Sequence, residues 1–399
     1  MKTSHRWFIA AALILLAVLI LGHVVTGFYT DALWFAQVGY ASVFWRRFLS
    51  FVFSRLGAAI FAGLLVLGNL WFVTRQLGPV HVRRRYGNLE ISEQIPRGLV
   101  TVGIFVAAIL AGWWLSDVKF GSGLSINVLT WLYRTPWHAT DPLFGKDLSF
   151  YVFALPFYNQ VTDLLLLTAL WSLILAVMGY ALVGTIRLRE NRLEVDPSVR
   201  RHATFLLAAV LVLLGIRLWI GRYGVLLHGS GFNGGIGYTD VHARLPAQRI
   251  VALLCVLTGA ALLYSGLRHT WGPAFLSFGL LILAAIGGGV LYPSFVQKFR
   301  VDPNEFRFEA PYIAWNIDFT RRAYDLDRVQ RKPYEYKRTE TEPAELSRRL
   351  AEIPVWDLEP LQTAYGQLQA FFPYYHFPDV DYDRYRTPDG TRQVAVAVR

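Results

Sequence analysis

Seven apolar runs of bilayer-spanning length fill the first 292 residues of the 399-residue sequence. A run of about 20 apolar residues crosses the hydrocarbon core of a membrane. Since lipid satisfies no backbone hydrogen bond, such runs must form helices. The sequence therefore predicts an all-α polytopic membrane protein with seven transmembrane helices in residues 1–292. The runs are Trp7–Phe28, Leu56–Val73, Gly98–Leu115, Leu164–Ile186, Ala203–Ile220, Ile250–Leu267 and Pro273–Tyr292.

Composition supports this fold class. Charged residues make up 17% of the chain, against about 25% in an average soluble domain. Glycines recur inside the runs, where small residues let membrane helices approach closely, so we expect a packed bundle. The runs contain Gly63, Gly68, Gly179, Gly259 and Gly287–Gly289.

The net charge of +11 arises in the membrane half, which does not favour a nucleic-acid partner. Residues 1–292 contain 23 Lys and Arg against 11 Asp and Glu, whereas residues 293–399 contain 16 against 17. Thirteen of the 23 basic residues lie at the N-terminus and in the short loops of one side, including Arg83–Arg85. Dense positive charge marks the cytoplasmic face. We therefore expect an integral membrane protein with a cytoplasmic N-terminus and, because the number of spans is odd, an extracytoplasmic C-terminus.

The tail, residues 293–399, has a normal charge content and predicts a soluble extracytoplasmic region of mixed α/β structure. Apolar groups at helical spacing predict helices over Glu309–Asp325 and Glu342–Glu352. Residues Arg392–Arg399 alternate as a strand with no turn or partner after it. This pattern suggests a truncated tail, the start of a larger domain.

Candidate site residues concentrate in two long outer loops. In residues 116–163, Asp141 is followed by turn residues, and Asp147 is a candidate N-cap for a short interfacial helix that ends before Pro156. In residues 221–249, glycines at 229, 231 and 234 match a dinucleotide pattern but lack the βαβ unit that it requires. A candidate polar site at the outer face comprises Asp141, Asp147, Arg217, Tyr238, Asp240 and His242.

Each candidate also has a structural interpretation. The first loop fits structural scaffolding at the outer leaflet, and the segment around Asp240 in the second loop fits a capped entry to a helix. Arg55 and Arg217 lie near the outer ends of their runs and are expected to extend to the interface, although Arg217 could instead face a polar cavity. No motif indicates a metal, a cofactor or a catalytic residue, so the sequence does not favour an enzyme.

Several stretches resemble uncharacterised protein family 0182, large multi-pass membrane proteins of bacteria. They run from the first span to the last strand. Each stretch alone is a weak match, but all of them together are specific for this family. The resemblance implies a multi-pass architecture and a location in the bacterial inner membrane, and it implies no catalytic residue. Since family members look about twice as long, this chain resembles an N-terminal portion. The matching stretches are Tyr29–Phe44, Asp141–Tyr158, Gly237–Asp240 with Leu245–Ala247, Val301–Asn304, Thr320–Tyr324 and Tyr374–Pro378.

Three functions remain open at this stage. The first is cell-envelope organisation or assembly through the extracytoplasmic region, with envelope proteins or a second copy as partners. It is favoured because the polar and charged motifs lie in the outer loops and the tail, whereas the spans are almost entirely apolar. The second is a permease or lipid transporter, which the absence of acids at mid-span disfavours. The third is an outer-leaflet membrane enzyme that uses Asp141, Asp147, Asp240 or His242.

Overall fold

The chain forms two compact units, residues 1–326 and 327–399, in a computed structural model. The structure describes residues 2–75, 81–86, 89–94, 97–118, 121–182, 186–189, 192–231, 234–268, 270–334, 342–350, 353, 357–369, 376–388 and 390–398. The first unit contains the predicted membrane domain and continues beyond Tyr292 to Leu326, because the last long helix packs back onto the loops. The expected membrane boundary at Tyr292 stays a prediction.

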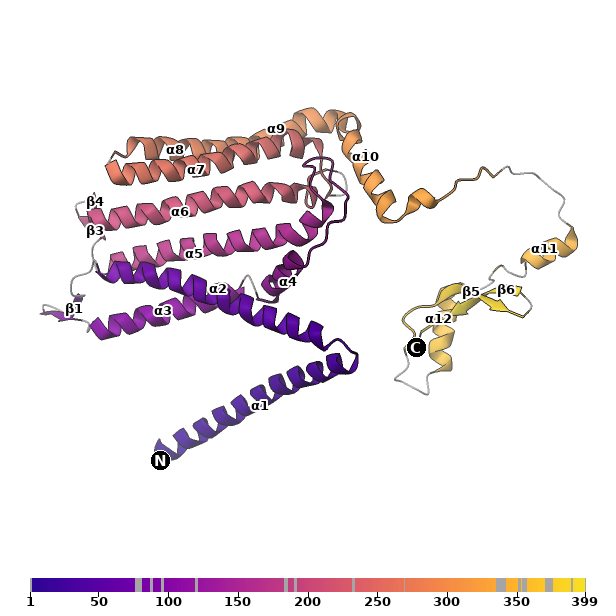
Figure 1. The fold of residues 1–399 in the computed structure, drawn as a ribbon, viewed down its shortest axis with the longest axis horizontal. Helices are drawn as coiled ribbons and strands as arrows, with labels where there is room; N and C mark the ends of the chain where they lie inside the picture. Colours follow the sequence, from indigo (N-terminus) through magenta and orange to yellow (C-terminus); the bar gives the residue numbers. More distant parts are fainter. Residues whose placement is uncertain are drawn as a thin grey trace. The chain divides into compact units, whose positions relative to one another are not determined.

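Seven helices among the described residues are long and apolar enough to cross a membrane, as the sequence predicted. Six of them run side by side, in the order α3, α2, α5, α6, α7 and α8 (Figure 1). With α1, the described residues contain the predicted number of long apolar helices, and most of these helices are longer than the apolar runs. The helices are α1 (Lys2–Gln37), α2 (Ala41–Arg75), α3 (Arg97–Val118), α5 (Leu155–Leu182), α6 (Pro197–Gly221), α7 (Leu245–Arg268) and the helix that begins with α8 (Gly272–Leu283).

The helix that begins with α8 continues through several shorter segments to Ala323. Asn304 has non-helical backbone angles (φ −140°, ψ 47°). The following helix, α10, runs in a different direction from α8 (Figure 1). The predicted helix over Glu309–Asp325 is confirmed within α10. The segments are η5 (Ala284–Leu291), α9 (Tyr292–Val296), η6 (Gln297–Val301), η7 (Asp302–Asn304) and α10 (Glu305–Ala323).

Four π-helical segments each end two residues before a proline. They are η1 (Phe150–Ala154), η4 (Asp240–Arg244), η5 and η6, which precede Pro156, Pro246, Pro293 and Pro303. Proline has no N–H, and its ring collides with the carbonyl one turn earlier. A locally wider turn lets the helix continue past the proline. The expectation that a short helix ends before Pro156 was therefore wrong: η1 and α5 form one helix over Phe150–Ala181.

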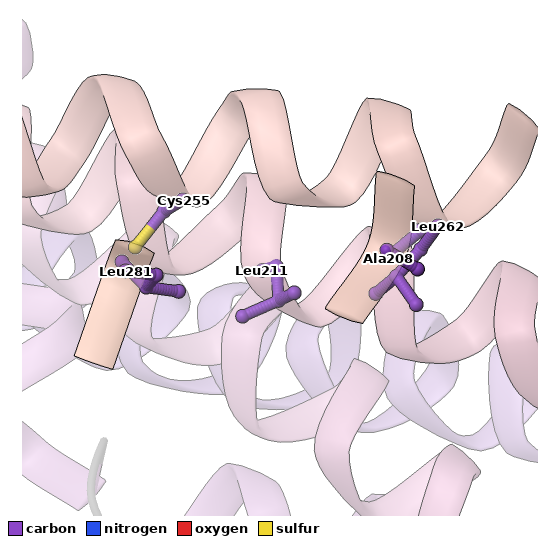
Figure 2. Close-up of a cluster of buried hydrophobic side chains, with 6 residues drawn as sticks. Ala208, Leu211, Cys255, Leu262 and Leu281 are labelled. Carbon is purple, nitrogen blue, oxygen red and sulfur yellow. The ribbon is translucent and has the colours of Figure 1, made fainter. Parts of the chain in front are cut away.

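Close packing of small residues joins neighbouring helices. A Cβ atom on Gly112 of α3 would lie 2.4 Å from the carbonyl oxygen of Ala59 in α2. Gly63, Gly179 and Gly259 also face neighbouring helices, as predicted, whereas nothing lies within 4 Å of the Gly68 position. Figure 2 shows the cluster where α6, α7 and α8 meet, with Leu211, Cys255 and Leu281 buried against one another.

Two β-hairpins connect long helices on the side predicted to be cytoplasmic. They contain the stretch Arg83–Arg85 and several other basic residues of that side. Strands this short give no clear sequence pattern, so both segments were expected to be loops. The hairpins pair β1 (His81–Tyr86) with β2 (Leu89–Gln94), and β3 (Ile186–Arg189) with β4 (Arg192–Val195). The bundle also includes the short helices α4 (Gly121–Leu132) and η2 (Arg222–Leu226).

The second unit has the mixed α/β structure that the sequence predicted. It contains α11 (Pro343–Leu350), α12 (Leu358–Leu368) and the antiparallel strands β5 (Asp381–Thr387) and β6 (Gly390–Val396). The Gln362 side chain donates hydrogen bonds to the carbonyls of Phe377 and Pro378 at 3.1 and 2.9 Å. The expectation of an unpaired final strand was wrong, since β6 pairs with the preceding β5.

Candidate functional site

Asp141 organises the turn that precedes η1. Its carboxylate accepts hydrogen bonds from the N–H groups of Leu143, Phe144 and Lys146 at 2.5–2.9 Å, and from the Tyr151 hydroxyl at 2.8 Å. Only 5% of the residue is exposed. Both oxygens are occupied by this chain's own donors. Asp141 therefore holds a turn closed and lacks a free oxygen for a substrate proton.

Asp147 caps the start of the following helix, as predicted. It accepts hydrogen bonds from the N–H groups of Trp137, His138 and Ser149 at 2.8–3.1 Å. The Ser149 side chain, followed by these N–H donors, lowers the pKa of Asp147 from 3.8 to about 2. Asp147 is thus a charged structural residue at neutral pH.

Asp240 is completely buried at the start of η4. One of its carboxylate oxygens accepts hydrogen bonds from the N–H groups of Ser230 and Gly237 at 2.7 and 3.1 Å. The other accepts the Ser230 hydroxyl at 2.9 Å and the Arg244 guanidinium at 3.0 Å. A buried carboxylate needs such compensation. Asp240 therefore fixes the glycine-rich loop onto η4.

Tyr238 and His242 stack on the same face of this segment, with ring centroids 4.1 Å apart. The Nδ1 atom of His242 donates to the Tyr238 carbonyl at 3.1 Å. The centroid of the Tyr238 ring lies 4.8 Å from the centroid of the Phe308 ring and 5.4 Å from the guanidinium carbon of Arg300. Both predicted residues thus pack against the chain that follows the last apolar run.

Glu309 of α10 completes this arrangement and was missed by the sequence analysis. It is 4% exposed, and its carboxylate accepts the Tyr238 N–H at 3.0 Å. A Cβ atom on Gly237 would lie 3.1 Å from both carboxylate oxygens, so glycine permits this approach. One sequence signal could have identified Glu309: it is an acidic residue three positions before Tyr312, and so on the same face of a predicted amphipathic helix. We call Ser230, Gly237–Arg244, Gln297 and Glu309 the loop–helix junction; Thr239 donates to Gln297 within it at 2.5 Å.

Arg217 lies apart from both loops and pairs with Asp163 across α5 and α6. Its Nε donates to the carboxylate at 2.5 Å, and its Nη1 donates to Asn159 at 3.2 Å. Arg55 of α2 likewise pairs with Asp117 of α3 at 2.5 Å. The expectation that these two arginines extend to the interface stays a prediction, and the structure adds a carboxylate partner for each. Asp163, assigned to a loop from the sequence, lies inside α5.

The predicted residues form three separate groups: the Asp141–Asp147 turn, the loop–helix junction and the Arg217–Asp163 pair. Within the described ranges, no group of three or more His, Cys, Asp and Glu side chains could hold a metal ion. A groove of about 580 Å³ lies between α2 and α6 and is lined by Asn69, Phe72, Ser198, Arg201, His202 and Phe205.

These features define a helical protein with seven membrane-length apolar helices among its described residues. Its loop–helix junction joins the loop between α6 and α7 to the chain after the last apolar run. The chain belongs to the Uncharacterised protein family (UPF0182), whose model matches residues 8–399. This finding confirms the resemblance seen in the sequence.

Similar proteins are bacterial. A UPF0182 protein of Pelobacter propionicus is 34% identical over 99% of this chain and 44% of its own length. One from Trichodesmium erythraeum is 33% identical over 100% of this chain and 43% of its own length, and one from Kocuria rhizophila is 31% identical over 96% and 39%. The chain thus spans less than half the length of these curated relatives. No solved structure matches it.

Proposed function

We propose that this chain is the membrane-anchored part of a cell-envelope protein that organises or assembles envelope components. In this role the bundle holds the polar chain after α9 at the extracytoplasmic face, where it meets partner proteins or a second copy. The bundle acts by positioning, and no catalytic step is assigned to it.

The loop–helix junction carries the proposal. Glu309 and Gln297 join the chain after the last apolar run to the loop between α6 and α7. Burying two carboxylates, Asp240 and Glu309, costs free energy unless their partners are fixed. Such an arrangement supports a protein whose function depends on a fixed orientation of α10.

The same contacts disfavour an outer-leaflet enzyme. Its candidate acids, Asp141, Asp147 and Asp240, each accept three or four hydrogen bonds from this chain. A carboxylate acts as a general base only when one of its oxygens can reach the substrate proton, and the donors of this chain already surround these three carboxylates.

Complementation with paired variants tests the proposal. Glu309→Ala leaves the Tyr238 N–H without its acceptor and loosens α10, whereas Glu305→Ala changes an exposed acid one turn earlier in the same helix. Both are placed in the full-length gene and expressed in a strain that lacks it. The Glu309 variant should insert normally, yet lose crosslinks to envelope proteins and fail to restore envelope composition. The Glu305 variant should restore it.

Two results would contradict the proposal. One is full complementation by Glu309→Ala after hydrogen exchange has shown that α10 is released. The other is a wild-type protein that crosslinks to no envelope partner and to no second copy.

A second candidate is a lipid transporter, which the open groove between α2 and α6 favours. It predicts lipid movement between leaflets of vesicles that contain the purified protein. Vesicles in which the labelled lipid stays in its original leaflet would exclude this candidate.

A further inference from the structure

The groove between α2 and α6 combines polar and apolar walls at one end of the bundle. Ser198, Arg201, His202 and Phe205 follow one another at helical spacing, so they share one face of α6. Asn69 and Phe72 face them from α2. The groove lies near the C-terminal end of α2 and the N-terminal end of α6, beside the basic hairpins of the predicted cytoplasmic side.

The wall formed by His202 is fixed by neighbours on two helices. Its Nε2 lies 3.1 Å from Oδ1 of Asn69, and its Nδ1 lies 2.9 Å from the hydroxyl of buried Tyr180. An amide oxygen only accepts, so Nε2 carries the proton and Tyr180 donates to Nδ1. The ring also meets Phe72 edge-on at 4.6 Å. This wall is preformed, and both imidazole nitrogens are already engaged.

The rim of the groove, in contrast, has hydrogen-bond donors that remain available to a ligand. The Arg201 side chain is exposed, and it forms no hydrogen bond or ion pair with any described residue. Ser198 adds a half-buried hydroxyl, and none of the six lining residues is acidic. A guanidinium beside a hydroxyl matches the oxygen geometry of a phosphate. The remaining exposed walls are apolar, since Phe205 is 61% exposed and Phe72 is 42% exposed.

We propose that this groove binds an anionic phospholipid of the cytoplasmic leaflet. The lipid phosphate lies on Arg201 and Ser198, and the first part of an acyl chain lies along Phe72 and Phe205. Three observations support this ligand: a cation without a partner in the described chain, exposed aromatic rings that line the same groove, and a position at the end of apolar helices. The volume of about 580 Å³ is within the range of small-molecule sites. The inference does not depend on the proposed scaffold role.

A net negative headgroup is favoured over a zwitterionic one. A zwitterionic lipid presents its own ammonium group, which offsets the attraction of the phosphate for Arg201. Basic residues at the cytoplasmic surface attract anionic lipids in the same way, but without a groove that holds the chain.

Native mass spectrometry of the purified full chain in mild detergent tests the proposal. The probes are phosphatidylglycerol and phosphatidylcholine with identical acyl chains, added at equal concentrations. We expect one tightly retained phosphatidylglycerol and about tenfold weaker retention of phosphatidylcholine. Arg201→Gln should weaken retention of phosphatidylglycerol about tenfold, and Arg201→Lys should restore part of it.

Arg268→Gln is the matched control, because Arg268 ends α7 on the same side of the bundle but does not line the groove. It should change lipid retention less than about twofold. The proposal is overturned if Arg201→Gln retains phosphatidylglycerol as well as the control does, or if the two lipids bind equally. Displacement of the lipid by millimolar inorganic phosphate would indicate a free-phosphate site instead, and would also overturn it.

Discussion

The contact between α2 and α3 gives a quantitative prediction about helix packing. Gly112 of α3 faces Ala59 and Gly63 of α2, and a Cβ atom there would lie 2.4 Å from a backbone oxygen and 3.1 Å from Gly63 Cα. A backbone oxygen has no rotamer to change, so Gly112→Ala must separate the two helices. Gly103 lies on the same helix with nothing within 4 Å of its Cβ position, which makes Gly103→Ala a matched control.

The expected magnitudes follow from two opposing terms. Alanine improves helix propensity by up to about 1 kcal/mol at either position. Overpacking costs about 1–3 kcal/mol, and we expect about 3 kcal/mol for a backbone clash this short. Gly112→Ala should therefore lower the free energy of unfolding by about 2 kcal/mol. Gly103→Ala should leave it unchanged or raise it slightly.

Equilibrium unfolding of the purified protein in mixed detergent micelles, monitored by tryptophan fluorescence, measures the difference in unfolding free energy between the two variants. The two variants should differ by about 3 kcal/mol. The reasoning is refuted if Gly112→Ala is as stable as Gly103→Ala, because α2 and α3 would then not be in close contact.

Three further predictions concern the polar contacts. Arg217→Gln should destabilise the bundle by about 2 kcal/mol in the same unfolding assay, and adding Asp163→Asn should recover part of the loss, since an unpaired half-buried charge is removed. Equal stability of the single and double variants would argue against the pair. Tyr151→Phe should cost about 1 kcal/mol, because Asp141 loses a donor, and no loss would contradict that bond. The low pKa of Asp147 stabilises the loop above about pH 4, and this stabilisation disappears as the pH falls towards about 2. Hydrogen exchange of the loop amides should change over the same pH range. Asp147→Asn should abolish this pH dependence.

The sequence predicted the helices well because lipid imposes a strong constraint. A membrane-length apolar run must form a helix, so the seven long apolar helices among the described residues followed directly from the sequence. The cap at Asp147 was also predictable, because a capping residue acts within a few positions of its own chain.

The remaining features depend on contacts between distant parts of the chain. Glu309 meets Tyr238 across 71 positions, and Arg217 meets Asp163 across 54. Local patterns contain no information about such pairs. The π-helical segments were also missed, because a proline alone suggests a helix boundary, and only the surrounding helix shows that it continues.

Cysteine accessibility tests the central claim that the chain crosses the membrane an odd number of times. The sequence has one cysteine, the buried Cys255, so Cys255→Ala gives a clean background. Ser4→Cys marks the N-terminus, and Tyr334→Cys marks an 89% exposed site in the second unit. In intact cells an impermeant thiol reagent should label only the Tyr334 position, and in inverted vesicles only the Ser4 position. Labelling of both positions from the same side would contradict the account.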